Sequence, residues 1–274
     1  MRAEARAPAM ACFATLAAAL LALPVAAQPG LSADAIAKRV WEREASEGRV
    51  GTMHFQLVAA SGAVRRRQAL MLHSDRRDAV RLAIFFQQPA SIANTAFLSH
   101  DHRAKPDETW LFLPATERVR RIPASQRADA FLGTDLSFGD LKDGFRFAPE
   151  DWTFAGGEQR SFRGRPHLWL TGRARTPEIA RETGYSAFRA LICPETLFPM
   201  LTEYDDREGK PMKRVEIQET ERIGGTWTAV RFTATNQRTG HRTEVHFTQM
   251  RHVPGLGQAL FAPDRLGDGA PRIP

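Results

Sequence analysis

Residues Phe131–Leu141 have the sequence FLGTDLSFGDL, in which five bulky apolar residues are mixed with two glycines, two aspartates and two hydroxyl residues. The glycines disfavour the interior of a helix, and the aspartates disfavour a buried strand. Asp135 and Asp140 lie five residues apart and could act as a carboxylate pair in acid–base chemistry. The alternative is a structural corner of the chain, and the composition favours it.

In the corner interpretation, Asp135 and Ser137 cap a short helical turn, because their side-chain oxygens accept hydrogen bonds from free backbone N–H groups. Gly133 and Gly139 give the backbone its freedom there. The apolar side chains then hold the corner against an apolar surface. The predicted lid or corner residues are Phe131, Leu132, Gly133, Asp135, Phe138, Asp140 and Leu141.

Alternation of apolar and polar residues on both sides of this stretch predicts β-strands. In the segment 79–86, for example, Val80, Leu82, Ile84 and Phe86 fall on one face. About eleven such segments follow one another with almost no helical pattern between them. Successive hairpins pair antiparallel, so the pattern predicts one large, curved sheet or a barrel. The predicted turn pairs are Gly156-Gly157, Glu208-Gly209, Gly224-Gly225 and Thr239-Gly240.

Helical patterns are confined to two places. Residues 31–45 predict one helix with Ser32 as its N-cap, and Leu31 and Ile36 have the spacing of a hydrophobic staple. Ile36, Val40 and Trp41 form the apolar stripe of this helix. Near the other end of the chain, residues 261–266 predict a single helical turn.

The first residues have the pattern of a signal peptide. Two arginines precede a short apolar run, and Val25 and Ala27 occupy the −3 and −1 positions of a cleavage site after Ala27. The run is too short for a good membrane span. We therefore expect a signal peptide at 1–27, a single domain at 28–266, a disordered tail at 267–274, and a periplasmic protein.

Charge and cysteine content bear on nucleic-acid binding and on disulfide bonds. The formal net charge is +7, but the basic groups alternate across strand faces, which favours solvated surfaces over nucleic-acid binding. Peripheral contact with an anionic membrane surface stays open. Once Cys12 leaves with the signal peptide, Cys193 is alone, so no intramolecular disulfide is possible and a buried structural thiol is expected.

Metal binding and catalysis are two alternative functions that the sequence can be searched for. His100 and His102 flank Asp101 and would share one face of a strand, where both could bind a metal, but the loop composition around them favours a polar hairpin tip. No Cys, Glu or third His at ligand spacing completes such a set. A nucleophile elbow, a phosphate-binding loop and a dinucleotide fingerprint are also absent. We expect no catalytic residues, no cofactor and no metal.

Several further motifs accompany FLGTDLSFGDL. They are WLFLP at 110–114, RRI at 120–122, Tyr204-Asp205 with Gly209, and TGHRT at 239–243. In these motifs, over roughly residues 87–266, the sequence resembles the outer-membrane lipoprotein-sorting protein family, which is related to the LolA and LolB lipoprotein carriers. One difference is Asn94, which stands where that family often has Gly.

The resemblance implies a mainly β, LolA-like fold. We expect an unclosed antiparallel barrel of about eleven strands, with an N-terminal helix and short lid helices over an apolar cavity. Burying an acyl chain of sixteen carbons in such a cavity would release roughly 12 kcal/mol, because each methylene contributes about 0.8 kcal/mol. The predicted lining residues are Leu82, Ile84, Phe86, Phe97, Trp110, Phe112, Phe131, Phe138, Trp169, Phe188, Leu197, Met200, Val230 and Phe232.

Two functions follow from this expectation. The first is a periplasmic carrier, expected to be a monomer, that binds lipid acyl chains or lipoprotein and moves them between envelope membranes. The second is an adaptor or sensor domain that works with an envelope transporter or a stress pathway. The two differ in whether the cavity or the protein surface holds the principal partner.

Overall fold

The computed structural model of the protein describes residues 31–76, 78–102 and 105–273. The predicted signal peptide and Cys12 lie outside these residues. The strands are β1 (Arg49–Val58), β2 (Val64–Asp75), β3 (Ala79–Gln88), β4 (Ala96–His102), β5 (Glu108–Leu113), β6 (Arg118–Arg121), β7 (Trp152–Phe162), β8 (Arg165–Ala174), β9 (Ala187–Ile192), β10 (Pro199–Asp205), β11 (Pro211–Ile223), β12 (Thr226–Asn236) and β13 (Arg242–His252).

The helices are few and short. The α-helices are α1 (Ala33–Trp41), α2 (Phe138–Asp143) and α3 (Pro177–Thr183), and the 3-10 helices are η1 (Ala124–Gln126), η2 (Phe131–Gly133), η3 (Gln258–Phe261) and η4 (Pro263–Asp268). None of the helices in the described part of the chain has the length and apolar character of a membrane span.

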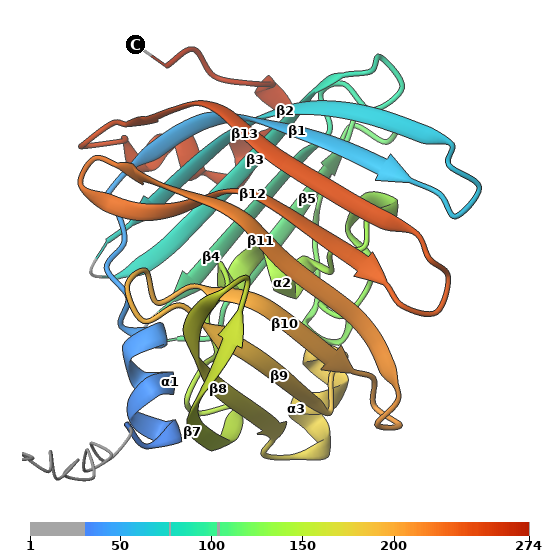
Figure 1. Ribbon diagram of the computed structural model, residues 1–274. Helices are drawn as coiled ribbons and strands as arrows, with labels where there is room; N and C mark the ends of the chain where they lie inside the picture. Colours follow the sequence, from blue (N-terminus) through green and yellow to red (C-terminus); the bar gives the residue numbers. More distant parts are fainter. Residues whose placement is uncertain (1–30, 77, 103–104, 274) are drawn as a thin grey trace, which may run out of the picture. The chain divides into compact units, whose positions relative to one another are not determined.

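All thirteen strands belong to one antiparallel sheet, in the order β6-β5-β4-β3-β2-β1-β13-β12-β11-β10-β9-β8-β7. The mainly β, unclosed antiparallel architecture is therefore as predicted, although the sheet has thirteen strands where about eleven were expected. One strand missing from the predicted set is β4, whose residues Ser99–His102 have the polar composition of a hairpin tip. The sheet is strongly bent, and α2 lies inside the bend (Figure 1).

Three of the four predicted turn pairs are confirmed, and the fourth is wrong. Gly156 and Gly157 lie inside β7, where the pairing with β8 shifts register between Gly156 and Gln159. Both have positive φ angles, of 113° and 118°. A Cβ atom on Gly156 would lie 2.5 Å from the carbonyl oxygen of Trp169. The two glycines thus form a β-bulge at which two backbones approach closely. A Gly-Gly pair at a bulge has the same composition as a Gly-Gly turn, which is why the sequence predicted a turn.

Backbone geometry accounts for two other residues that the sequence singled out, Ser32 and Asn94. Ser32 caps α1 and accepts a hydrogen bond from the backbone N–H of Ala35 at 3.2 Å, as predicted. The helix ends at Trp41, earlier than expected, and Leu31 is 41% exposed. Asn94 has a φ of 63°, in the left-handed region that Gly and Asn tolerate best, so either residue suits this position.

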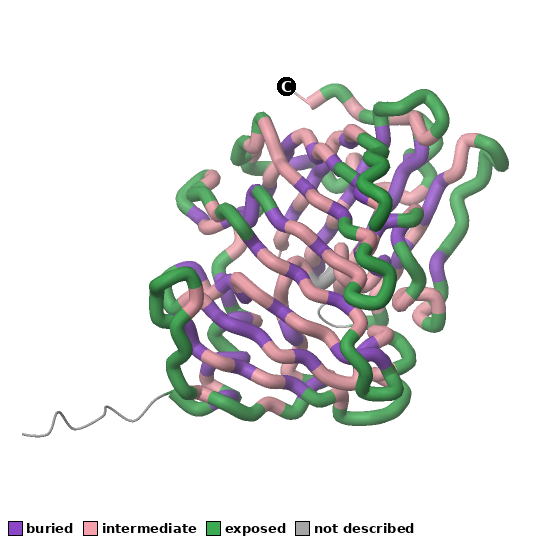
Figure 2. Tube along the Cα trace, turned by 45° about the vertical axis from the view of Figure 1, so that its right-hand side comes forward, coloured by how far each residue is buried: buried purple, intermediate pink, exposed green. Residues whose placement is uncertain are grey.

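Buried and partly exposed residues alternate along many strands (Figure 2). The buried residues form three clusters. The first joins the inner faces of β1–β5 and β11–β13 to the 131–138 segment. The second packs α1 against β7–β9, and the third packs η3 and η4 against the other face of β1–β5. Leu82, Ile84 and Phe86, three of the four residues predicted to share a face, contact the first cluster, whereas Val80 belongs to none of the three clusters.

The end of the chain forms more structure than one helical turn. The segment predicted as a single turn, 261–266, overlaps the last residue of η3 and most of η4, and Phe261 and Leu266 are buried. Beyond them, in the tail predicted to be disordered, Ile273 packs against the third cluster, and its carbonyl accepts a hydrogen bond from Arg251 at 3.3 Å.

One connection differs from all the others. Every other pair of consecutive strands is hydrogen-bonded, whereas β6 and β7 form opposite edges of the sheet. The chain between them, residues 122–151, includes η1, η2 and α2. Its side chains Phe131, Leu136 and Phe138 join the first cluster. Residues Phe131–Leu141 therefore cross the concave side of the sheet.

The bulge yields a stability prediction. We expect Gly156→Ala to lower the free energy of unfolding at least twice as much as Gly209→Ala, as measured by urea denaturation. Both positions have positive φ, which costs a non-glycine residue about 1–2 kcal/mol, but only at Gly156 does a Cβ also meet a backbone oxygen. Equal costs for the two variants would contradict this account of the bulge.

Candidate functional site

A cavity of about 200 Å³, partly open to solvent, lies on the concave side of the sheet. Residues of β1–β3 and β10–β13 line it, together with residues that follow α1 and residues from Leu136 to Trp152. Its apolar lining includes Met53, Met71, Ile84, Trp227, Ala229 and Phe232. The neighbouring first cluster is close-packed, so the cavity is the part of the concave side that side chains leave unfilled.

Strand periodicity explains which side chains face the cavity. Successive side chains point to opposite faces of a sheet, so Met53 and Phe55 on β1 share the inner face, as do Ile84 and Phe86 on β3. Phe85, between the last two, instead joins the third cluster on the other face. Both faces of β3 are apolar because the C-terminal segment covers the outer one.

Three of the predicted lining residues, Leu82, Ile84 and Phe232, line this cavity. Phe86, Phe97, Phe131 and Phe138 lie in the first cluster beside it, with Met200 packed against them. The rings of Phe97 and Phe131 are 5.2 Å apart in an edge-to-face contact, and those of Phe131 and Phe138 are 5.6 Å apart. These residues fill the part of the concave side next to the cavity.

The remaining predicted residues lie elsewhere. Trp110 and Phe112 belong to the third cluster, with the C-terminal helices. Phe188 stacks on Phe147 under α1, at a ring distance of 4.0 Å. The guanidinium of Arg160 lies 3.6 Å from the Trp169 ring. Val230 is buried outside the three clusters. Leu197 lies in the turn before β10, where its φ of 57° places its backbone in the left-handed region.

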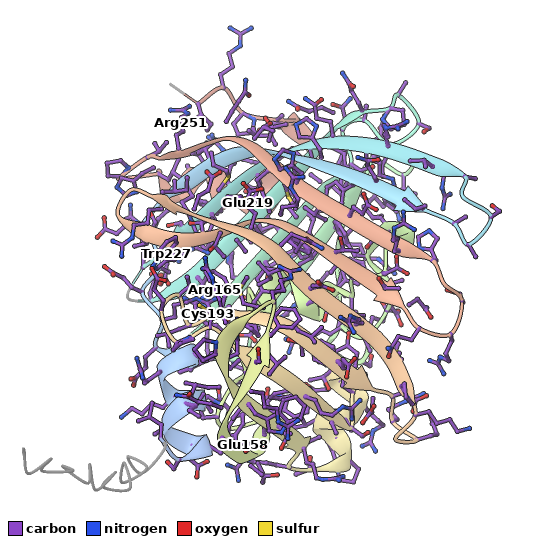
Figure 3. All side chains as sticks on the ribbon, in the orientation of Figure 1. Glu158, Arg165, Cys193, Glu219, Trp227 and Arg251 are labelled. Carbon is purple, nitrogen blue, oxygen red and sulfur yellow. The ribbon has the colours of Figure 1, made fainter. Side chains whose placement is uncertain are left out.

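Sequence reasoning missed most of the lining. Met53 and Met71 alternate correctly for inner-face positions, and this periodicity was the available signal. Trp227, at the start of β12 (Figure 3), follows a turn and carries no local signal of its role. Cys193 is a free, half-buried thiol just beyond β9 (Figure 3).

The 131–141 segment is held at two carboxylates. At the first, Asp135 Oδ2 lies 2.7 Å from Thr243 Oγ1 and 2.6 Å from His241 Nδ1, and the Asp135 side chain is 6% exposed. The prediction that Asp135 caps a helix is thus wrong. The carboxylate instead joins this segment to the TGHRT stretch, so the two motifs are partners in space.

At the second carboxylate, the helix cap is confirmed for Ser137. Its side chain accepts from the backbone N–H of Asp140, whose carboxylate accepts from the N–H of Ser137 at 2.7 Å. The same carboxylate forms an ion pair with the buried Lys213 and accepts from the Tyr185 hydroxyl at 3.0 Å. Donor groups of the protein therefore engage the carboxylates of both aspartates. The corner interpretation accounts for both residues without a role in acid–base chemistry.

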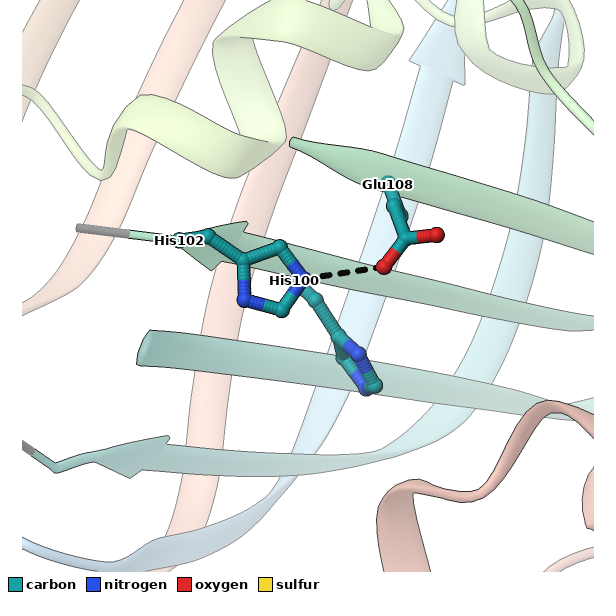
Figure 4. A group of neighbouring side chains, drawn as sticks. All are labelled: His100, His102 and Glu108. Atoms are coloured by element: carbon teal, nitrogen blue, oxygen red, sulfur yellow. Dashed lines mark hydrogen bonds and ion pairs between the residues drawn. The ribbon is translucent and has the colours of Figure 1, made fainter. Parts of the chain in front are cut away.

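The structure adds Glu108 to the two histidines considered as metal ligands (Figure 4). It lies on β5 opposite His100, and ligand atoms of His100, His102 and Glu108 are all within 4.8 Å of one another. A long-range pairing of this kind is invisible to sequence spacing.

Other contacts compete with metal binding at this place. Lys105 and Arg121 lie 3.1 and 3.3 Å from Glu108, and the hydrogen bonds from Lys105 and His102 hold its pKa below the usual value. His100 Nε2 lies 2.9 Å from the carbonyl oxygen of Phe261. Two neighbouring cations disfavour a bound metal ion, so this group serves better as a polar link between β4, β5 and η3.

Comparison with known proteins places these features in context. A family model described only as uncharacterized proteins matches residues 78–268, which includes both aspartate contacts and most of the cavity lining. No curated protein sequence matches the chain.

Several solved structures share the fold. A domain from Vibrio parahaemolyticus described as an outer membrane lipoprotein-sorting protein is 25% identical, with a TM-score of 0.78 over 86% of this chain and 98% of that one. A DUF1329 family protein from Desulfovibrio piger is 22% identical, with a TM-score of 0.76 over 85% and 97%. A LolA superfamily protein from Nitrosomonas europaea is 18% identical, with a TM-score of 0.64 over 85% and 99%.

The Asp135 contacts generate a prediction. We expect Asp135→Ala to lower the free energy of unfolding by about 3 kcal/mol, because hydrogen bonds to charged groups contribute about 1.5–3 kcal/mol each and Thr243 loses its acceptor. Urea denaturation measures this cost. The exposed Asp268→Ala is the matched control, with an expected change below about 0.5 kcal/mol. Similar costs at both positions would show that the anchor does not hold the segment.

Proposed function

We propose that this chain, which belongs to a family described only as uncharacterized proteins and shares its fold with outer membrane lipoprotein-sorting and LolA superfamily proteins, is a periplasmic carrier that binds a lipid acyl chain in its cavity. The bound chain would be part of a lipid or a lipoprotein that moves between envelope membranes. The predicted signal peptide at 1–27 supports export to the periplasm.

The observation that carries this proposal is an unfilled, partly open space with apolar walls inside an unclosed sheet. Small closed barrels fill their interior with their own side chains. Here the edges β6 and β7 do not pair, and side chains such as Met53, Ile84 and Phe232 border empty space. An acyl chain in that space would remove these surfaces and its own methylenes from water.

The size of the cavity limits what it holds in this conformation. At about 200 Å³ the cavity is somewhat larger than an apolar cavity of about 150 Å³ that holds a benzene ring, so it accepts only part of a long acyl chain. Each buried methylene contributes about 0.8 kcal/mol, whereas micromolar affinity needs about 8 kcal/mol. Micromolar binding therefore needs a wider cavity or a second source of affinity.

The 131–141 segment is the element that would widen the cavity. Leu136, Gly139 and Leu141 belong to its lining, so an outward shift of the segment lengthens the space along the sheet. The segment is attached to the strands through side chains, by the packing of Phe131, Leu136 and Phe138 and by the contacts of Asp135 and Asp140, rather than by pairing as a strand. We infer that it acts as a lid that opens for loading and release.

The first test is direct detection of cargo. We expect native mass spectrometry of the full-length protein, expressed with its own N-terminal segment and recovered from the periplasm, to show a bound lipid. Adding fatty acid to delipidated protein should change tryptophan fluorescence, because Trp152 and Trp227 line the cavity. Protein that never carries lipid and does not respond to fatty acid would contradict the carrier function. A stable protein partner with an empty cavity would favour an adaptor instead.

A second test fills the cavity. Ala229 is buried and lines it, so Ala229→Leu places about three extra carbons where the acyl chain would lie. We expect the affinity for dodecanoate, measured by calorimetry, to fall at least 10-fold, since three methylene positions are worth about 2.4 kcal/mol. Ala155→Leu, at an exposed site on β7, is the control and should bind like the wild type. Undiminished binding by Ala229→Leu would place the ligand elsewhere.

A further inference from the structure

Part of the cavity wall is formed by positively charged side chains from three separate parts of the chain. Arg43 follows α1, Arg49 begins β1, and Arg146 follows α2. His73 on β2 is paired directly with Arg49 across the strands and also lines the cavity. We call these four residues the arginine cluster.

Neutral groups hold Arg43 in place. Arg43 is 8% exposed, and its guanidinium donates to the carbonyl oxygens of Gly144 at 2.9 Å and Leu197 at 3.0 Å. Its flat face lies 3.8 Å from the centre of the Phe198 ring. Arg146 lies beside it and donates to the carbonyl oxygen of Arg43 at 2.8 Å. The carbonyl groups fix the position of the Arg43 guanidinium but do not neutralise its charge.

Arg49 has a donor to spare. Its Nη1 donates to the hydroxyl of Thr228 at 2.8 Å, and its Nη2 lies 3.3 Å from Nδ1 of His73. Its Nε atom is buried and has no hydrogen-bond partner. An unsatisfied buried N–H of a charged group costs free energy that a suitable acceptor would recover. Among the side chains that the structure describes, neither Arg43 nor Arg49 forms an ion pair.

The electrostatics show mutual repulsion among the three arginines. Burial lowers the pKa of Arg43 well below its usual value, and repulsion by Arg146 and Arg49 lowers it further. Burial and repulsion by Arg146, opposed in part by Asp75, lower the pKa of Arg49 to about 10, so it is still charged at neutral pH. Burial, then Arg49 and Arg146, lower the pKa of His73 well below its usual value, so this ring stays neutral.

Carboxylates also line the cavity. Asp140 pairs with Lys213, and Glu182 lies 3.9 Å from Arg127. Glu44 is exposed, and Asp151 has a contact of its own. None of these four forms an ion pair with Arg43 or Arg49 within the described residues. Arg43 and Arg49 therefore place positive charge at the cavity that no ion pair offsets.

We propose that the arginine cluster binds the anionic head, a carboxylate or a phosphate, of the lipid whose acyl chain occupies the rest of the cavity. The guanidinium group suits this role because its planar fork of donors matches the oxygens of both groups. This inference rests on the proposed carrier function and adds to it the class of lipid: one with a negatively charged head.

The arrangement along the strands fits an amphiphile. Arg49 and Met53 lie four residues apart on β1, and His73 and Met71 lie two apart on β2, so each pair shares a strand face. All four line the cavity, and the lining thus changes from charged to apolar along two adjacent strands. The head group would also supply the affinity that a short buried stretch of acyl chain lacks.

The test compares lipids that differ only in the head. Calorimetric titration of the full-length wild-type protein with dodecanoate, dodecyl phosphate and dodecanol should show at least 10-fold tighter binding of one or both anions than of the alcohol. The two anions separate a carboxylate head from a phosphate head. Equal binding of all three would overturn the head-group inference and leave the carrier function intact. Binding of none would overturn the carrier function itself.

Variants locate the effect. We expect Arg49→Met to lose the preference for the anion while it binds dodecanol as the wild type does, and Arg49→Lys to keep part of the preference. Arg65→Met removes an exposed arginine of β2 and should leave every affinity unchanged. If Arg49→Met keeps the full preference, the anion binds elsewhere and the assignment is wrong. Should Arg49→Met not fold, the wild-type comparison and Arg49→Lys still decide the question.

Discussion

The connection from β6 to β7 constrains the rest of this structure. These strands are consecutive in sequence but form opposite edges of one bent sheet, so residues 122–151 have to cross its concave side. Backbone polar groups in an apolar interior need hydrogen-bond partners, and the short helices and the Ser137 cap provide them. Phe131 and Phe138 fill part of the concave side, and the cavity is the space that remains beside them.

Buried charge has two different roles on the two sides of this cavity. Asp140 is paired with Lys213, and Asp135 is surrounded by Thr243 and His241, so each of these charges has a protein partner. Removing one partner of such a pair is strongly destabilising, which makes these contacts structural anchors. Arg43 and Arg49 are the opposite case, because carbonyl and hydroxyl groups hold them without neutralising their charge. A charge left in that state favours an anionic ligand.

The candidate site was only partly predictable. Period-two patterns correctly grouped Leu82, Ile84 and Phe86 on one face of β3. They could not show that the inner face of β5 is different from the face that carries Trp110 and Phe112, because the C-terminal helices make the outer face apolar too. The arginine cluster had no sequence signal at all, since its members lie up to about a hundred residues apart and meet only through the fold.

Local sequence patterns were enough to predict the class of fold: alternating strands, the cap of α1 at Ser32, three hairpin turns and a corner at 131–141, because hydrogen bonding and side-chain periodicity act over a few residues. Only long-range packing makes Gly156-Gly157 a bulge, brings Asp135 to His241 and places Glu108 beside two histidines. These outcomes depend on which strands become neighbours. That choice is made by the packing of the whole sheet around one crossing segment, which no local pattern encodes.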